Sequence, residues 1–207
     1  MFNNLLFKNL VPIISFTLML STVVVSSVWS PSSGAALNEQ NRQLSSNNKT
    51  TQAVAVDVLI GSDDITGIRL AYRPYIYELK NVPYFDKLDI YWETSLNFWE
   101  YGEQNSHETN FVLALSPVVS KTFYYIKDKY PLKWEFGIGV SLVNDTKFAG
   151  KDIGSHYQFE DRLGLTIDLN SDQTESVSLR YMHYSNGGLN SKNPGVDFLN
   201  MSYAYKF

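Results

Sequence analysis

Alternation of apolar and polar residues recurs along this chain at the length of a β-strand, and it strongly limits the folds available. Successive side chains of a strand point to opposite faces, so alternation marks a strand with two different faces. From Ala53 onward no window has the amphipathic period of a helix. An even number of strands suits a closed up-and-down barrel of the bacterial type. The eight alternating segments are about 53–61, 66–76, 86–101, 109–123, 132–143, 157–169, 174–185 and 195–207.

The two faces of these segments distinguish a membrane barrel from a soluble one. In segment 132–143, large residues such as Trp134 and Phe136 alternate with Glu135 and Gly137. Eight strands enclose an interior only just wide enough for side chains, and large apolar residues from every strand would overfill it. The apolar face therefore points to lipid. We expect an all-β fold, an eight-stranded antiparallel up-and-down transmembrane β-barrel over residues 53–207.

Charged residues on the opposite face are expected to fill the interior. We interpret them as a structural network of opposed charges, because a sealed interior requires paired and hydrogen-bonded ions. A transport role is disfavoured because side chains fill so narrow a barrel. The residues concerned are Arg69, Arg73, Glu93, Glu135, Glu160, Arg162 and Arg180.

The N-terminal segment carries features of export. Lys8 precedes an apolar run over residues 10–29, and small residues follow up to Ala36. This order is typical of a secretory signal peptide, which we expect at residues 1–36. The run is also long enough for a retained membrane anchor, and both alternatives imply export. Residues 37–52 are polar without periodicity, which predicts a flexible lead-in.

Two further features indicate the outer membrane of a Gram-negative cell. The chain ends in Met-Ser-Tyr-Ala-Tyr-Lys-Phe, which resembles the terminal-strand signal of the bacterial barrel-assembly machinery. Trp92, Trp99 and Trp134 fit aromatic girdles at the membrane interfaces. A formal charge of -4 without basic clusters gives no reason to expect nucleic acid. The absence of cysteine excludes thiolate metal sites and a cysteine nucleophile.

A reactive set of side chains lies at the predicted outer rim, between the last two strands. Strand parity places His183 and Ser185 on the apolar face, and a hairpin register pairing 183 with 197 places Asp197 beside them. Polar groups facing lipid are costly and usually functional. A base, a hydroxyl and a carboxylate together can activate a serine nucleophile. The alternative is that the three residues lie among head groups and only solvate the rim.

The sequence around these residues resembles a known family. His-Tyr-Ser-Asn-Gly-Gly-Leu at 183–189 and Asn-Pro-Gly-Val-Asp at 193–197, with residues 135–140 and 159–164, are similar to the lipid A 3-O-deacylases called PagL. The similarity covers residues 109–207 well, and the rest of the barrel only by strand pattern. It implies an eight-stranded outer-membrane barrel that hydrolyses the ester-linked acyl chain at position 3 of lipid A with a Ser-His-Glu triad.

Carried over residue by residue, the resemblance implies that His183 is the general base and Ser185 the nucleophile. Asp197 stands where the family has glutamate and is one methylene shorter, although aspartate orients the base in other triads. The remaining implied positions are Asn186 and Asn193 for the oxyanion hole or its support, Gly187 in place of an alanine, and Phe159 as an aromatic beside the site.

Three functions stay open on the sequence alone. The first is deacylation of lipid A or a related lipopolysaccharide in the outer leaflet. The second is a non-enzymatic barrel with a structural, adhesion or lipid-binding role, and the third is an acyltransferase or phospholipase using the same residues. No metal-ligand spacing accompanies His107 or His156, so neither a metal nor a cofactor is expected. Acyl-chain preference, latency in the membrane and oligomeric state, including a homodimer, are not determined.

Overall fold

A computed structural model describes residues 51–62, 64–102 and 108–207. The expected signal peptide at 1–36 and the lead-in up to residue 50 lie outside the described residues. Among those residues, no helix is long and apolar enough to cross a membrane. The strands are β1 Ala53–Gly61, β2 Ile65–Arg73, β3 Ile76–Val82, β4 Asp86–Tyr101, β5 Glu108–Ile126, β6 Tyr130–Val143, β7 Lys147–Phe148, β8 Lys151–Asp152, β9 Tyr157–Asp168, β10 Glu175–Ser185 and β11 Val196–Lys206.

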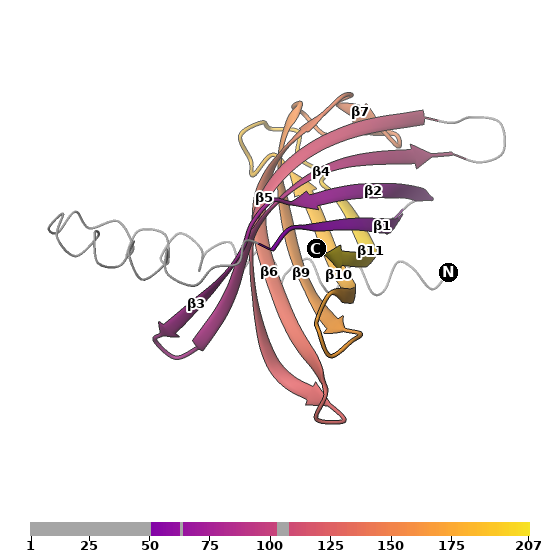
Figure 1. Ribbon diagram of the computed structural model, residues 1–207. Helices are drawn as coiled ribbons and strands as arrows, with labels where there is room; N and C mark the ends of the chain where they lie inside the picture. The colour runs from indigo at the N-terminus through magenta and orange to yellow at the C-terminus, as the bar shows by residue number, and fades with distance from the viewer. Residues whose placement is uncertain (1–50, 63, 103–107) are drawn as a thin grey trace, which may run out of the picture. The chain divides into compact units, whose positions relative to one another are not determined.

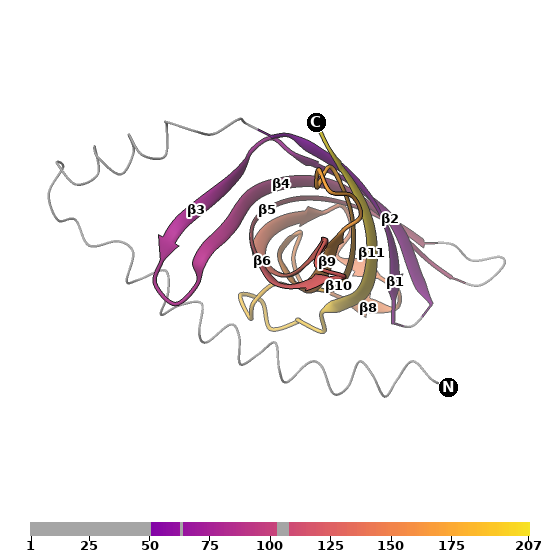
Figure 2. The same cartoon turned by 60° about the horizontal axis from the view of Figure 1, so that its bottom comes forward.

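Eight of these strands close into an antiparallel barrel. The order around the barrel is β1, β2, β4, β5, β6, β9, β10 and β11, and pairing of β11 with β1 closes the ring. In Figure 2 the strands curve around a common interior. The predicted all-β, eight-stranded fold is confirmed.

Two hairpins extend beyond the ring at the end opposite β7 (Figure 1). Pro74 follows β2, and because proline has no backbone N–H it interrupts the strand. β3 then resumes as a partner of the first part of β4, and β5 and β6 continue to a turn at residues 127–129. The strand expected at about 66–76 is therefore present and ends at Arg73. Outside the ring neither face of β3 is fully buried, so no core imposes alternation on its sequence.

The outward face of the barrel is apolar, as the alternation predicts. In β1, Val54, Val56, Val58 and Ile60 are 44 to 55% exposed, whereas the residues between them are buried. An apolar surface that surrounds a barrel is stable in a lipid bilayer and not in water.

The interior contains the expected charge network, with Asp57 as an additional member. Arg69 donates to Asp57 at 2.8 Å, and both Arg69 and Arg162 donate to Glu93 at 2.5 Å. Arg73 donates to the other Glu93 oxygen at 2.7 Å. Since these groups are buried and paired with opposite charges, they fill the barrel rather than line a pore.

An apolar cluster closes the interior at the end where β10 stops. Trp99 packs there against Tyr184 and Phe198 with ring centroids 4.7 and 4.9 Å away, and Phe148 covers it from the β6–β9 loop. The assignment of Trp99 to an aromatic girdle is therefore wrong. On β4 the even-numbered residues face outward, so Trp92 is 44% exposed whereas Trp99 is 1% exposed.

Candidate active site

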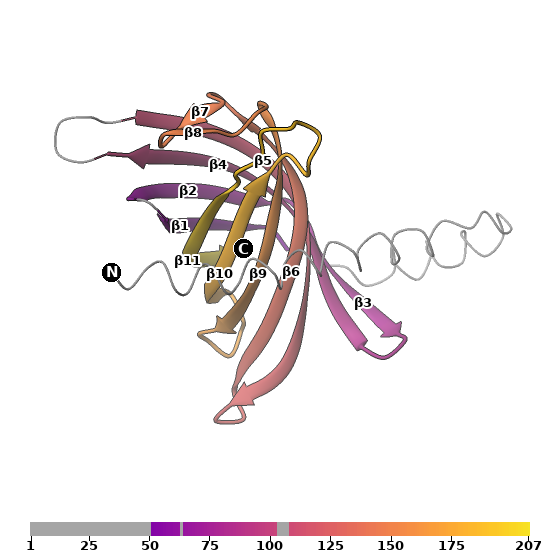
Figure 3. The same cartoon turned by 180° about the vertical axis from the view of Figure 1, so that it is seen from behind.

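The strand register brings the proposed reactive residues to one outward patch at the end of β10. His183 pairs with Asp197 of β11, as the sequence predicts, and Ser185 pairs with Phe159 of β9. Side chains that are directly opposite on one face lie close together. Figure 3, which views the barrel from behind, shows β9, β10 and β11 side by side below the loop that joins β10 to β11.

His183 and Asp197 form a direct contact. The His183 Nδ1 and Asp197 Oδ1 atoms are 2.6 Å apart, and the two side chains are 21 and 18% exposed. The aspartate arm is therefore long enough to reach the imidazole. If Nδ1 donates to the carboxylate, Nε2 of the neutral ring is the acceptor, which is the tautomer that a general base needs.

Ser185 lies two residues after His183 on the same face and is 8% exposed. Within the described part of the chain its hydroxyl makes no hydrogen bond. In enzymes without bound substrate, contacts between nucleophile and base are often long and tighten in the complex. The serine hydroxyl is therefore covered, and no described residue uses its capacity to donate a hydrogen bond.

Asn186 organises the loop after β10. Its side chain is fully buried, donates to the carbonyls of Ile153 and Lys192 at 3.1 and 2.7 Å, and accepts from the Gly188 N–H at 3.0 Å. Its own N–H donates to Asn193 Oδ1 at 2.9 Å. Both amide protons of Asn186 are in use, so this side chain supports the loop. The exposed Asn193 keeps its Nδ2 group without a partner among the described residues.

Two glycines allow side chains of the site to approach the backbone. Gly187 has φ of +64°, and a Cβ atom there would lie 2.8 Å from the Phe159 ring. Gly195 has φ of +69°, and a Cβ atom would lie 2.7 Å from His183 Cε1. Larger residues are disfavoured in this backbone conformation. The start of the β10–β11 loop therefore packs against the ring of Phe159, and its end packs against the ring of His183.

The β6–β9 loop, with the short β7–β8 hairpin that the sequence did not predict, braces the β10–β11 loop. Asn190 Nδ2 donates to the Gly154 carbonyl at 2.8 Å, and Lys192 Nζ donates to Asp152 Oδ2 at 2.5 Å. The hydrogen bond from Lys192 lowers the pKa of the half-buried Asp152 carboxyl, which favours its charged form beside the ammonium. The two loops are thus held together beside the site.

Sequence reasoning missed the roles of two residues on this patch. Asp161 of β9 pairs with His183 from the side opposite Asp197, is 5% exposed, and its buried Oδ1 has no partner within the described residues. The Tyr181 hydroxyl donates to Asp197 Oδ1 at 2.5 Å. Parity could have found Asp161, because it shares the apolar face of Phe159 and Leu163.

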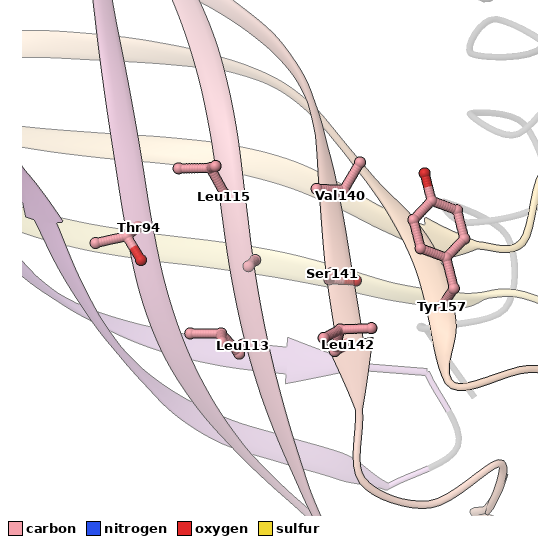
Figure 4. A pocket seen from close by; sticks show the side chains of 8 residues that line it. Thr94, Leu113, Leu115, Val140, Ser141, Leu142 and Tyr157 are labelled. Carbon is pink, nitrogen blue, oxygen red and sulfur yellow. The ribbon is translucent and has the colours of Figure 1, made fainter.

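An apolar groove of about 450 Å³ lies on the outward face near this patch (Figure 4). A row of directly paired residues leads to it from Ser185, through Phe159 of β9 and Val140 of β6 to Leu115 of β5. Its other lining residues are Thr94, Leu113, Ala114, Ser141, Leu142 and Tyr157. The groove therefore starts beside the aromatic ring that flanks the serine.

The chain matches the family model described as lipid A 3-O-deacylase (PagL) over residues 66–206. It is 42% identical over 73 residues to the lipid A deacylase PagL of Bordetella bronchiseptica, covering 35% of this chain and 40% of that protein. It is 31% identical over 117 residues to the lipid A deacylase PagL of Pseudomonas aeruginosa, covering 56% of this chain and 64% of that protein. The matched regions thus span less than two thirds of either relative.

The fold is similar to a solved structure described as the crystal structure of the outer membrane enzyme PagL. The TM-score is 0.60 at 24% sequence identity, and the match covers 74% of this chain and 98% of that one. The likeness supports the barrel architecture.

Proposed function

Because this chain belongs to the lipid A 3-O-deacylase family (PagL), we propose that it is an esterase that removes the acyl chain ester-linked at position 3 of lipid A. The chain is a barrel of the Gram-negative outer membrane. The observation that carries the proposal is the contact of His183 Nδ1 with Asp197 Oδ1 at 2.6 Å on the lipid-facing surface, with Ser185 two residues further along β10. The ester of a lipid beside the barrel can reach such a serine without entering the interior.

The reaction follows from these three side chains. His183 Nε2 takes the Ser185 proton, the serine oxygen attacks the ester carbonyl, and a tetrahedral intermediate forms. Asp197 orients the ring and stabilises the imidazolium. The imidazolium then protonates the departing sugar oxygen, which leaves an acyl-serine. Water, deprotonated by the same histidine, attacks this ester, and the fatty acid and free serine are released.

Stabilisation of the oxyanion is assigned to the β10–β11 loop. Asn193 Nδ2 and the Gly187 N–H have no hydrogen-bond acceptor in the described residues, whereas Asn186 is used to hold the loop. Donors fixed in advance near the developing negative charge contribute strongly to catalysis. We therefore assign Asn193 as the side-chain donor and Asn186 as its support.

The groove beside Phe159 is the proposed site of the acyl chain. Its lining is apolar, and it opens from the surface that contacts lipid. Asp161 lies on the other side of His183 with an unpaired buried oxygen. Unpaired buried acceptors on a lipid-facing surface are costly and are usually kept for function. We therefore place Asp161 on the substrate side of the patch.

We expect Val140→Trp to reduce hydrolysis of long-chain esters by about tenfold relative to short-chain esters. The indole would occupy the groove and displace about two methylene groups, each worth about 0.8 kcal/mol when buried. The measurement compares short and long acyl esters with detergent-purified protein. Ile68→Trp is the matched control, since Ile68 is an exposed outward residue of β2 outside the groove. Equal losses with both esters would contradict the placement of the acyl chain.

The proposed function is tested by mass spectrometry of lipid A from cells that express the protein. We expect lipid A to lose one ester-linked acyl chain, specifically from position 3. Unchanged lipid A together with activity toward phospholipids would favour a phospholipase instead. Transfer of the chain to an added acceptor would identify an acyltransferase.

We also propose that β11 is recognised during assembly by the barrel-assembly machinery. Its outward residues Met201, Tyr203 and Tyr205 are exposed, as is Phe207 directly after the strand. All residues of the proposed triad come from one chain, so the mechanism does not require a homodimer.

A further inference from the structure

Tyr181 is covered although it faces the lipid side of the barrel. It lies on β10 two residues before His183, paired with Leu199 and Leu163. Those two leucines are each 42% exposed, whereas Tyr181 is 8% exposed. A covered tyrosine needs a partner for its hydroxyl, because an unpaired buried hydroxyl destabilises the fold.

The partner of Tyr181 is the acid of the proposed triad. Tyr181 donates to Asp197 Oδ1 at 2.5 Å, and His183 Nδ1 contacts the same oxygen at 2.6 Å. A single carboxylate oxygen therefore joins the phenol and the imidazole. Hydrogen bonds to ionised groups are short and about twice as strong as neutral ones.

We infer that Tyr181 is a positioning residue of the triad, which fixes Asp197 Oδ1 against His183. The inference rests on the proposed triad and adds a fourth member that does not touch the substrate. Asp197 reaches across from β11 on the apolar face, where a carboxylate lacks the water that would normally solvate it. The phenol holds this carboxylate in place and stabilises its charged form, which must persist while His183 becomes an imidazolium.

The first test is Tyr181→Phe, which removes only the hydroxyl. We expect kcat to fall by about 10- to 100-fold, the equivalent of one hydrogen bond to a charged group, with KM changed by less than about twofold. The matched control is Tyr203→Phe, at an exposed tyrosine on the same outward face of β11, which should keep wild-type kcat. An unchanged kcat in Tyr181→Phe, or a loss confined to KM, would overturn the inference.

A double-mutant cycle shows whether Tyr181 acts through Asp197. In an Asp197→Ala background, Tyr181→Phe should change kcat by less than about twofold, because the group that it positions is gone. An equal loss in both backgrounds would mean that the hydroxyl acts by another route. Unfolding midpoints of all variants exclude a loss of folded protein as the cause.

A measurement by nuclear magnetic resonance tests the same inference without depending on enzymatic activity. The chain has three histidines, so nitrogen-labelled histidine allows the Nδ1 proton of His183 to be identified by its loss in His183→Ala. Tyr181→Phe should shift this signal, including in an inactive Ser185→Ala background, and Tyr203→Phe should not. If the wild type hydrolyses no ester, the proposed function fails. The shift of the His183 Nδ1 proton signal in Tyr181→Phe then decides by itself whether Tyr181 positions the Asp197–His183 pair. A signal that does not move would overturn the inference.

Discussion

Replacement of Ser185 by alanine is expected to lower kcat for ester hydrolysis by about 1,000-fold or more while the barrel stays folded. The hydroxyl is the only group that the substitution removes. It makes no hydrogen bond to a described residue, so its loss should not lower the stability of the barrel. Without it no acyl-serine can form. Residual hydrolysis would come from the oxyanion donors and from substrate binding.

The measurement is the rate of acyl ester hydrolysis by purified protein, together with the mass of lipid A from expressing cells. Ser191→Ala removes a hydroxyl from an exposed position of the adjoining loop and should leave the rate unchanged. Activity in Ser185→Ala close to that of the wild type would exclude the serine mechanism. Activity retained by both His183→Ala and Asp197→Ala would likewise exclude the triad.

The second large effect is expected in the interior. Glu93→Ala should lower the free energy of unfolding by about 3–5 kcal/mol, because this buried carboxylate contacts three buried guanidinium groups that would lose an opposite charge. Arg69 and Arg162 contact one oxygen of Glu93, and Arg73 contacts the other. Removal of Glu93 takes away the carboxylate contact of the buried Arg73 and leaves Arg69 and Arg162 with fewer carboxylate partners.

Denaturant-induced unfolding in detergent micelles, followed by tryptophan fluorescence, measures this change. Glu78→Ala is the control. Glu78 is a 42% exposed carboxylate that pairs with Lys80 and Lys87, and its removal should cost at most about 1 kcal/mol. If the two variants lose equal stability, the interior network does not stabilise the barrel as proposed.

Much of this arrangement could be predicted from the sequence because strands have a period of two. In a two-faced strand, each position is assigned to lipid or to the interior by parity alone. Parity also places His183 and Asp197 on the same face of the last two strands, and the structure shows that they pair. The same rule applied to β4 would have placed Trp99 inside, where it packs against Tyr184 and Phe198.

Other parts of the site could not be predicted, because they depend on contacts between distant segments. The bonds of Asn186 to Ile153 and of Asn190 to Gly154 join two loops, and loops have no period from which their docking follows. β3 was not predicted for a related reason. It lies in a hairpin outside the ring and has no buried face, so its sequence need not alternate between apolar and polar residues.

The sequence by itself determined the barrel, the two faces of its eight strands and the outward patch that carries His183, Ser185 and Asp197, because alternation is a local property. Only the tertiary structure decided how that patch is held. It places Asp197 Oδ1 between Tyr181 and His183, sets Asp161 on the opposite side, and extends a groove away from Phe159. These features depend on the distances between side chains of neighbouring strands. Differences of tenths of an ångström decide whether a hydrogen bond forms, and such distances are set only when the barrel closes.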